Sequence, residues 1–222
     1  MEAHDLPETG FLSCASDRLK RLLAGQATEI TLTQGQVLFE QGDVGDALFV
    51  IVSGTVEFSI LSSTGRKLSL DIMRPGDIFG EIALFDPGPR TATAIACEPC
   101  RVRRVRNRDV LDQIRQHPDL ATDMIRLAGQ RMRWMNSQLN EQVFLPISSR
   151  LARKLLHLTA ETQSCTLGLS QSELAEFVGA TREAISKTLS AWKQTGVIGA
   201  TRGGPEILDR PALHRLADPD LI

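Results

Sequence analysis

The chain has 222 residues, enough for two domains of about 100 residues each. With 42% hydrophobic and 23% charged residues it is not an intrinsically disordered protein, because a disordered chain lacks the apolar side chains that offset the entropy cost of ordering. No apolar run comes near the roughly 20 residues of a membrane-spanning helix, and the acidic N-terminus lacks the basic and apolar segments of a secretory signal. Four scattered cysteines predict reduced thiols rather than a disulfide framework, and hence a cytoplasmic protein.

Charge is distributed unevenly along the chain. Residues 1–100 carry 7 Lys and Arg against 14 Asp and Glu, whereas residues 101–222 carry 18 against 13. Basic charge concentrated in one half is typical of a nucleic-acid-binding region beside a region with another role. Random surface composition also produces differences of this size, so charge alone leaves the question open.

Residues 30–105 predict a β domain, preceded by a short helix over residues 17–24. Runs of β-branched and aromatic residues, such as those at 37–39, 48–52 and 56–60, alternate with glycines at intervals that suit a turn after each strand. Many short strands with regular turns indicate a barrel or a double-sheet roll.

Residues 107–144 change to a helical period, with one interruption at His117-Pro118. Beyond it, apolar residues recur every three or four positions from Leu120 to Val143 and form a single stripe. Such a stripe belongs either to a core helix or to one half of a two-stranded coiled coil. A position between two domains favours the coiled coil, because a linking helix has less core to pack against.

The C-terminal part reads as a small helical domain that starts after Pro146. Its predicted elements are helices over 148–160, 170–178 and 181–194, a glycine-rich hairpin over 199–207, and a short helix that starts near Pro211.

Two constellations carry chemistry, and the first surrounds Gly80. Gly80 allows close approach of the backbone to a ligand, and residues 81–84 can form one helical turn whose free N–H groups suit an anion. Arg90 can contact a phosphate with two parallel hydrogen bonds, while Glu81 suits a sugar hydroxyl. Phosphate and ribose together indicate a nucleotide. An ion pair between Glu81 and Arg90 that merely closes the loop is an equal alternative.

The second constellation lies at residues 170–192. Ser170 and Glu173 form the pattern of a capping box, Gly179 suits a turn, and Thr181 can cap a second helix. The inward face of that helix consists of Ile185, Leu189 and Trp192. Its exposed N-terminal face offers Arg182, Glu183, Ser186 and Lys187. These side chains suit the reading of base edges, so the pattern favours a helix-turn-helix over an αα-hairpin with a solvated face.

These motifs resemble those of the Crp–Fnr family of bacterial transcription regulators, in the branch typified by the cyclic AMP receptor protein. Residues 80–84 and 89–93 are similar to the phosphate-binding cassette of cyclic-nucleotide domains, and residues 41–56 resemble the roll of the same domain. Residues 181–187 look like the recognition helix of the family. The resemblance extends from about residue 11 to residue 217.

The resemblance implies an α+β fold in three parts. Residues 1–118 would form a cyclic-nucleotide-binding β-roll (a double-stranded jelly roll), residues 119–145 a long dimerisation helix, and residues 146–222 a winged helix-turn-helix domain. The implied function is transcription regulation by a homodimer whose binding to a palindromic, TGTGA-like DNA site is switched by 3′,5′-cyclic AMP. RNA polymerase would be a further partner, and no membrane would be involved.

The resemblance also implies site residues. The expected ligand contacts are Gly80, Glu81, Ile82, Ala83, Arg90, Thr91, Met135 and Asn136. The expected DNA contacts are Ser170, Thr181, Arg182, Glu183, Ser186, Lys187 and Arg202. By carry-over, Glu81 would accept from the ribose 2′-hydroxyl and Arg90 would pair with the cyclic phosphate, with Thr91 beside it.

One departure leaves the base open. Where the cyclic AMP receptor protein has a Thr-Ser pair that meets the adenine, this chain has Met135-Asn136. Asn136 can hydrogen-bond adenine or guanine edges, and Thr91 beside Arg90 can favour guanine. Cyclic AMP is the expected ligand, with cyclic GMP, either nucleotide, another ligand or a constitutive DNA binder as alternatives.

Other functional classes have less support. An iron–sulfur or other metal site needs a group of ligands, and the cysteines and histidines of this chain do not fall at ligand spacing. No catalytic set of Ser, His and Asp or of Cys and His is recognisable, so an enzyme is not expected. A nucleotide-binding signalling subunit that acts on a protein partner has no need of the helix-turn-helix pattern.

Overall fold

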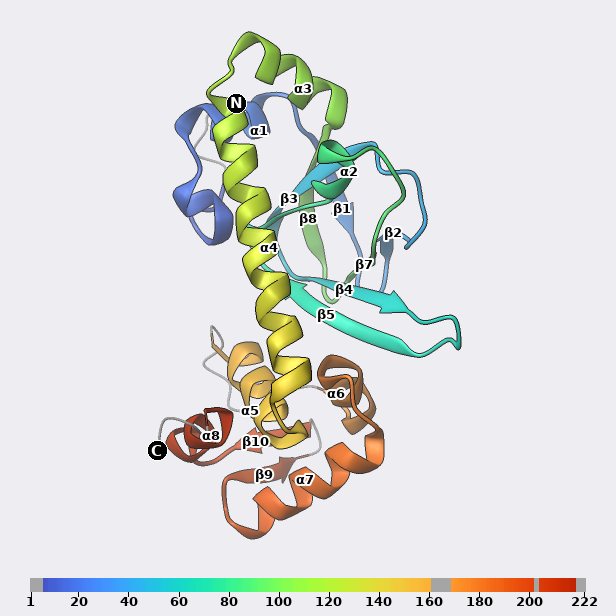
Figure 1. The fold of residues 1–222 in the computed structure, drawn as a ribbon, viewed down its shortest axis with the longest axis vertical. Coiled ribbons are helices and arrows are strands. Elements are labelled where there is room, and N and C mark those ends of the chain that lie inside the picture. Colours follow the sequence, from blue (N-terminus) through green and yellow to red (C-terminus); the bar gives the residue numbers. More distant parts are fainter. Residues whose placement is uncertain (1–5, 161–168, 202–203, 219–222) are drawn as a thin grey trace. The chain divides into compact units, whose positions relative to one another are not determined.

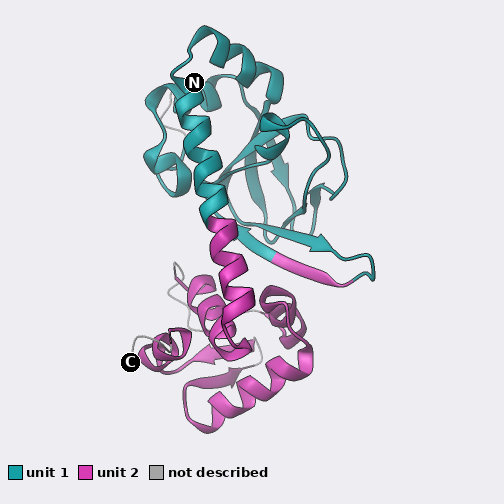
Figure 2. Cartoon of the chain, viewed as in Figure 1, with its two compact units in different colours: residues 1–65, 70–133 teal, residues 66–69, 134–222 magenta. Residues whose placement is uncertain are grey.

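The computed structural model describes residues 6–160, 169–201 and 204–218. The chain divides into two compact units, residues 1–65 with 70–133 and residues 66–69 with 134–222 (Figure 2). The boundary lies within one long helix, after Arg133. The expected three-part division, with bounds after residues 118 and 145, stays a prediction.

Strands between residues 28 and 106 of the described chain form two four-stranded sheets (Figure 1). One sheet has the order β1 (Thr28–Leu32), β8 (Cys100–Arg106), β3 (Ala47–Ser53), β6 (Ile78–Phe79), and the other has the order β2 (Val37–Phe39), β7 (Thr93–Ala96), β4 (Val56–Leu61), β5 (Lys67–Met73). The two sheets share one apolar core. Within it, Phe39 and Phe58 of one sheet contact Phe49 and Phe79 of the other, with ring centroids 5.0 to 6.2 Å apart. The predicted double-sheet roll is therefore confirmed.

Several helices pack against this roll. They are η2 (Gly10–Cys14), α1 (Asp17–Gly25), α2 (Ile82–Phe85), α3 (Asn107–Gln116) and the first part of α4 (Leu120–Phe144). The leucines of α1 pack with Leu120 and Met124 of α4 in a second core cluster, which also includes Val110 of α3. The break between α3 and α4 falls at His117-Pro118, because proline cannot continue a helix that precedes it.

The apolar stripe of α4 is buried at its start and exposed over the rest. Leu120, Met124 and Leu127 are almost fully buried. The exposed members of the stripe are Met132, Met135, Leu139 and Val143. The core interpretation thus holds for the first turns, while the coiled coil stays a prediction for the remainder. Among the described residues, no helix combines the length and the apolar character needed to cross a membrane.

The second unit is a helical domain with a small wing. Its further elements are α5 (Ile147–Leu158), α6 (Gln171–Val178), α7 (Arg182–Gln194), β9 (Ile198–Thr201), β10 (Gly204–Ile207) and α8 (Arg210–Ala217). Strands β9 and β10 pair antiparallel, and all six elements contribute to one core. Together with the roll and the long helix, this confirms the predicted α+β fold with a C-terminal winged helix-turn-helix.

Local capping explains where the helices of this domain begin. Ser170 and Glu173 form the predicted capping box of α6, and the hydroxyl of Thr181 accepts from the Ala184 amide at the start of α7. Between the two helices, Gly179 adopts a left-handed conformation with φ of 66°, which favours glycine. These caps position the exposed face of α7 that carries the polar residues singled out above.

The last turn of α4 is tied to this domain by polar contacts. Gln142 donates to the carbonyl of Val178 at the end of α6 (3.2 Å), and Arg150 of α5 donates to the same carbonyl (3.1 Å). Arg153 of α5 pairs with Glu141 of α4 (3.2 Å). The end of α4 is therefore joined by polar contacts to α5 and to α6, the first helix of the helix-turn-helix.

The core of the C-terminal domain should depend strongly on Leu155, which is fully buried in α5. We expect Leu155→Ala to lower the free energy of unfolding by about 2–5 kcal/mol, because the cavity cannot be refilled completely. Urea unfolding followed by the fluorescence of the buried Trp192 measures this loss. Leu208→Ala, at a site 59% exposed, is the matched control and should change stability by less than about 0.5 kcal/mol. Equal losses in both variants would contradict this assignment of the core.

Candidate functional site

The turn between β6 and α2 requires glycine. Gly80 has φ of +77°, and a Cβ at this position would lie 2.7 Å from Nη1 of Arg90 and 3.0 Å from the carbonyl oxygen of Ala47. Directly after Glu81 comes α2, a single turn. The first N–H groups of any helix lack acceptors within that helix. The amides of Ile82 and Ala83 lie at the start of α2, and their expected contact with a ligand stays a prediction.

Arg90 is a buried cation, only 6% exposed. Its Nη1 donates to the carbonyl of Gly80 (3.1 Å) and its Nη2 to that of Ala47 (2.8 Å). The guanidinium carbon lies 4.4 Å from the ring centroid of Phe39 and 5.3 Å from that of Phe49. Burial lowers the pKa of Arg90, while Asp46 opposes that shift. A guanidinium stays charged even so.

The Nε atom of Arg90 differs from its two other nitrogens. Its Nε is buried and has no hydrogen-bond partner among the described residues. Burying a donor of a charged group without an acceptor costs free energy, so an anion that accepted from this Nε would stabilise the site. The neighbouring backbone amides of α2 have the same preference.

Glu81 lies beside this donor set and is also buried, at 2% exposed. Its Oε1 accepts from Nε of Arg131 in α4 (2.9 Å), and Nη2 of Arg131 donates to the carbonyl of Ile78 (2.6 Å). The alternative of an ion pair between Glu81 and Arg90 is therefore wrong, because Glu81 pairs with Arg131. A carboxylate accepts several hydrogen bonds, so this pair leaves capacity for a sugar hydroxyl.

Arg131 is the residue of this site that sequence reasoning missed. It is 50 positions from Glu81 and belongs to no local motif. One signal was available, since Arg131 lies one helical turn before Met135 in the stripe of α4. Nothing in the sequence shows which turn of that helix faces the roll.

The other expected ligand contacts differ in exposure. Ala83 is 5% exposed and Ile82 43% exposed, whereas the side chain of Thr91 is exposed next to Arg90. Met135 and Asn136 occupy exposed positions of α4, beyond the boundary between the two units. Their expected contact with a base stays a prediction.

The expected DNA contacts gather around the start of α7. One groove is lined by Gln171, Arg182, Glu183, Ser186, Lys187 and Ser190. Four of these were predicted from the sequence, and Gln171 and Ser190 are additions contributed by α6 and the third turn of α7. Ser170 and Thr181 are the N-caps of the two helices. Arg202 lies outside the described residues.

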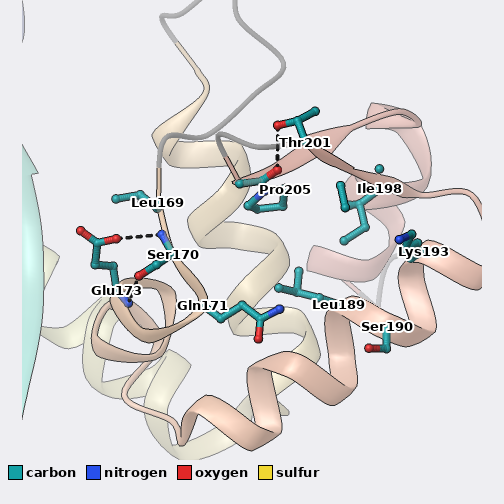
Figure 3. Close-up of a pocket in the computed structure, with 13 residues that line it drawn as sticks. Leu169, Ser170, Gln171, Glu173, Leu189, Ser190, Lys193, Ile198, Thr201 and Pro205 are labelled. Atoms are coloured by element: carbon teal, nitrogen blue, oxygen red, sulfur yellow. Dashed lines mark hydrogen bonds between the residues drawn. The ribbon is translucent and has the colours of Figure 1, made fainter.

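A second pocket of this domain lies between the start of α6, helix α7 and the wing (Figure 3). Leu169, Leu189, Ile198 and Pro205 supply its apolar lining. Lys193 lines it from α7, and Glu173 is engaged there with the amide of Ser170.

Comparison with known proteins agrees with this geometry. Residues 29–117 match the model of the cyclic nucleotide-binding domain, and residues 149–216 match that of the Crp-like helix-turn-helix domain. The CRP-like cAMP-activated global transcriptional regulator of Mycobacterium tuberculosis is 34% identical over 203 residues, which cover 88% of this chain and 90% of the relative. The chain belongs to the Crp–Fnr family of transcription regulators.

Further relatives agree with this membership. The cyclic AMP receptor protein of Thermus thermophilus is 32% identical over 83% of this chain and 85% of its own length. The crystal structure of the Thermus thermophilus catabolite activator protein superposes with a TM-score of 0.53 at 29% identity, covering 94% of this chain and 98% of that one.

A c-di-GMP-responsive regulator of Xanthomonas campestris shares the fold, with a TM-score of 0.74 at 22% identity, over 86% of this chain and 97% of that one.

Membership of this family establishes the general function. The chain is a cyclic-nucleotide-binding helix-turn-helix transcription regulator. The family is one of regulators rather than enzymes, which confirms the prediction that the chain is not an enzyme.

The pair between Glu81 and Arg131 allows a direct test. We expect Arg131→Ala to lower the free energy of unfolding by about 3 kcal/mol, because it leaves a buried carboxylate without its partner. The double variant Glu81→Gln/Arg131→Ala should be more stable than Arg131→Ala alone, since it removes the unpaired charge. Urea unfolding of the wild type, Glu81→Gln, Arg131→Ala and the double variant completes the cycle. Arg115→Ala, which breaks an exposed pair with Asp112, is the control. Additive losses from the two substitutions would refute the coupling.

Proposed function

We propose that this regulator is a cytoplasmic homodimer whose binding to a palindromic, TGTGA-like DNA site is switched by cyclic AMP. The proposed nucleotide ligand rests chiefly on Arg90, a buried cation. Its Nε has no acceptor among the described residues, and the first amides of α2 are free as well. A cyclic phosphate offers the acceptors that these donors need. Its single negative charge also balances the buried guanidinium.

The remaining residues of the cassette fit the sugar of such a ligand. Glu81 is buried and held in place by Arg131, with acceptor capacity left for the ribose 2′-hydroxyl. A carboxylate beside an anion site would repel a phosphate, so its role is better explained by a hydroxyl donor. Gly80 lets the backbone turn between these groups. This combination supports a nucleotide over a simple inorganic anion.

Cyclic AMP is the first candidate among nucleotides. The Mycobacterium tuberculosis relative is named as cAMP-activated and the Thermus thermophilus one as a cyclic AMP receptor. Cyclic GMP is the second candidate, because Asn136 stands where the adenine contact is expected and can also pair with guanine. Thr91, which follows Arg90 in the chain, can also favour guanine. Cyclic AMP is therefore the proposed ligand, and cyclic GMP is the alternative to be tested.

The proposed dimer rests on the exposed part of the α4 stripe. Met132, Leu139 and Val143 are each about 60% exposed and recur at intervals that place them on one helix face. An apolar stripe of this length suits a second copy of the same helix, related by a two-fold axis. Two recognition helices would then meet two half-sites about 10 base pairs apart, centre to centre.

Sequence reading is assigned to helix α7. Arg182, Glu183 and Lys187 are exposed on its first turns and line one groove. Arginine and lysine suit the O6 and N7 atoms of guanine, and glutamate suits the N4 amine of cytosine. These three residue types support the half-site of the proposal. RNA polymerase is the proposed further partner of the DNA-bound dimer.

The proposed switch passes through the end of α4. Ligand contacts of Glu81 and Arg90 would be relayed along α4 to the DNA-binding domains, which would change orientation. The hydrogen bonds of Gln142 and Arg150 to the Val178 carbonyl tie this end of α4 to the helix-turn-helix. Coupling of this kind typically amounts to about 1–3 kcal/mol.

A gel mobility shift on a TGTGA-N6-TCACA duplex tests the proposal. The protein is titrated without nucleotide, with cyclic AMP and with cyclic GMP, at one fixed salt concentration. A shift that requires cyclic AMP supports the proposal, and one that requires cyclic GMP identifies the alternative ligand. A shift in every lane would show a constitutive DNA binder. If no lane shifts, calorimetry with each nucleotide separates a wrong ligand from a wrong half-site.

Arg90→Ala should abolish the response to nucleotide, because it removes the buried donor that the phosphate is proposed to meet. In the gel shift we expect DNA binding at the level of the nucleotide-free protein, whatever the cyclic AMP concentration. Circular dichroism checks that the roll remains folded. Arg101→Ala, an exposed arginine of β8, is the matched control and should respond normally. An unchanged nucleotide affinity in Arg90→Ala would remove the cassette from the proposal.

Lys187→Ala should weaken binding by about 1–3 kcal/mol at a single base position, as expected for a base contact. Competition with duplexes that vary one base pair at a time locates that position. Lys193→Ala, on the same helix but towards the wing, is the control and should change affinity alike for all sequences. If Lys187→Ala also weakens all duplexes equally, Lys187 contacts phosphate rather than a base.

A further inference from the structure

Asn107 makes contacts that neither the motifs nor the family comparison explain. It is the first residue of α3. Its Nδ2 donates to two backbone carbonyls, that of Ala83 in α2 (3.0 Å) and that of Gly45 in the loop before β3 (3.2 Å). Its own backbone amide donates to the carbonyl of Asp46 (2.9 Å). One residue thus joins the single-turn helix, the loop and the start of α3.

The orientation of this side-chain amide follows from its surroundings. The group that faces the carbonyls of Gly45 and Ala83 must be a donor, so it is the NH₂ end. Oδ1 of Asn107 is buried and lacks a partner in the described chain. A buried acceptor without a donor costs free energy. This cost is tolerated at a position where the two N–H bonds are needed.

Helix α2 depends on such external support. It has four residues, and a helix of one turn does not hold its shape in isolation. The carbonyl of Ala83 lies in the part of the turn that has no acceptor role within so short a helix, and Asn107 supplies its donor. The loop packs equally closely, since a Cβ on Gly45 would lie 2.2 Å from the Cβ of Ala83. Asn107 donates to the carbonyls of both residues in this contact, Gly45 and Ala83.

The same loop also fixes the backbone of Arg90. The amide of Arg90 donates to the carbonyl of Asp43 (2.7 Å), and the amide of Gly42 donates to the carbonyl of Arg90 (2.9 Å). Both proposed phosphate contacts, Arg90 and the α2 amides, therefore rest on segments that converge near Asn107.

We propose that Asn107 is a positioning residue for the phosphate of the cyclic nucleotide, acting through its hydrogen bonds to the carbonyls of Ala83 and Gly45. It sets the position of the α2 amides before the ligand arrives and couples that position to α3. The inference rests on the proposed nucleotide function and adds a residue outside the cassette. Asn107 is 24 residues beyond Ala83, so no local sequence motif includes it.

The test compares Asn107→Ala, Asn107→Asp and the control Asp112→Ala in the full-length protein. Asp112 pairs with Arg115 on the same helix, and its side chain is 57% exposed. Asn107→Asp keeps the shape of the side chain but directs oxygen instead of N–H at two carbonyls. We expect both Asn107 variants to weaken cyclic AMP binding about tenfold by calorimetry, as the loss of one to two hydrogen bonds requires. Asp112→Ala should bind like the wild type.

Hydrogen exchange without nucleotide supplies a readout that a general structural role would not produce. The amides of residues 84–86, which donate to the carbonyls of Glu81 and Ile82 within the turn, should exchange about tenfold faster in both Asn107 variants, while the amides of α1 and β8 exchange as in the wild type. Cyclic AMP affinity within twofold of the wild type in Asn107→Asp would overturn the proposal. So would uniform exchange changes, or failure of both variants to fold, since either result makes Asn107 a general structural residue.

The proposed function and this inference fail separately. If the wild type binds no cyclic AMP, the proposed ligand is wrong, and exchange at residues 84–86 still decides whether Asn107 holds α2. If the wild type binds and Asn107→Asp binds equally well, the ligand stands and the positioning role is lost.

Discussion

A buried cation, Arg90, constrains the packing of the roll around it. Arg90 lies among phenylalanine rings and donates to the carbonyls of Gly80 and Ala47, yet its Nε has no acceptor in the described chain. Removing a guanidinium from water is expensive, and backbone carbonyls and ring faces repay only part of that cost. The Nε of Arg90 therefore stays a buried donor without an acceptor among the described residues, which supports the proposed contact with a phosphate.

Several local features follow from this constraint. Gly80 must be glycine because Arg90 occupies the space of its Cβ, and Gly45 must be glycine because Ala83 lies against it. The glycines of this region therefore mark close packing as well as turns. Because the cassette is built from a single helical turn and two loops, its shape depends on residues outside it. In the proposed switch, a bound ligand would act on other elements through these residues.

Two such links leave the cassette for the helices of the same unit. Arg131 connects Glu81 to α4, and Asn107 connects Ala83 to α3. Both are hydrogen bonds between groups with little exposure, so each is sensitive to small displacements of its partner. At the other end of α4, Gln142 and Glu141 make comparable contacts with the helix-turn-helix domain. Helix α4 therefore makes polar contacts both with Glu81 and with the helix-turn-helix domain.

The sequence by itself determined the elements and their class. The roll, the break at Pro118, the capping box at Ser170 and the turn at Gly179 were predictable, because each depends on periodicity or on residues a few positions apart. The outward residues of α7 followed from the same helical spacing.

Tertiary structure decided the partners. Glu81 had two plausible roles in the sequence, and only the packing of α4 on the roll gave it Arg131, 50 positions away. The inward position of Arg90 and the double contact of Asn107 likewise arise from segments that meet only after the sheets have formed. Local patterns decide which backbone conformation a segment prefers, whereas a buried polar group takes its partner from whatever the fold brings within hydrogen-bond distance.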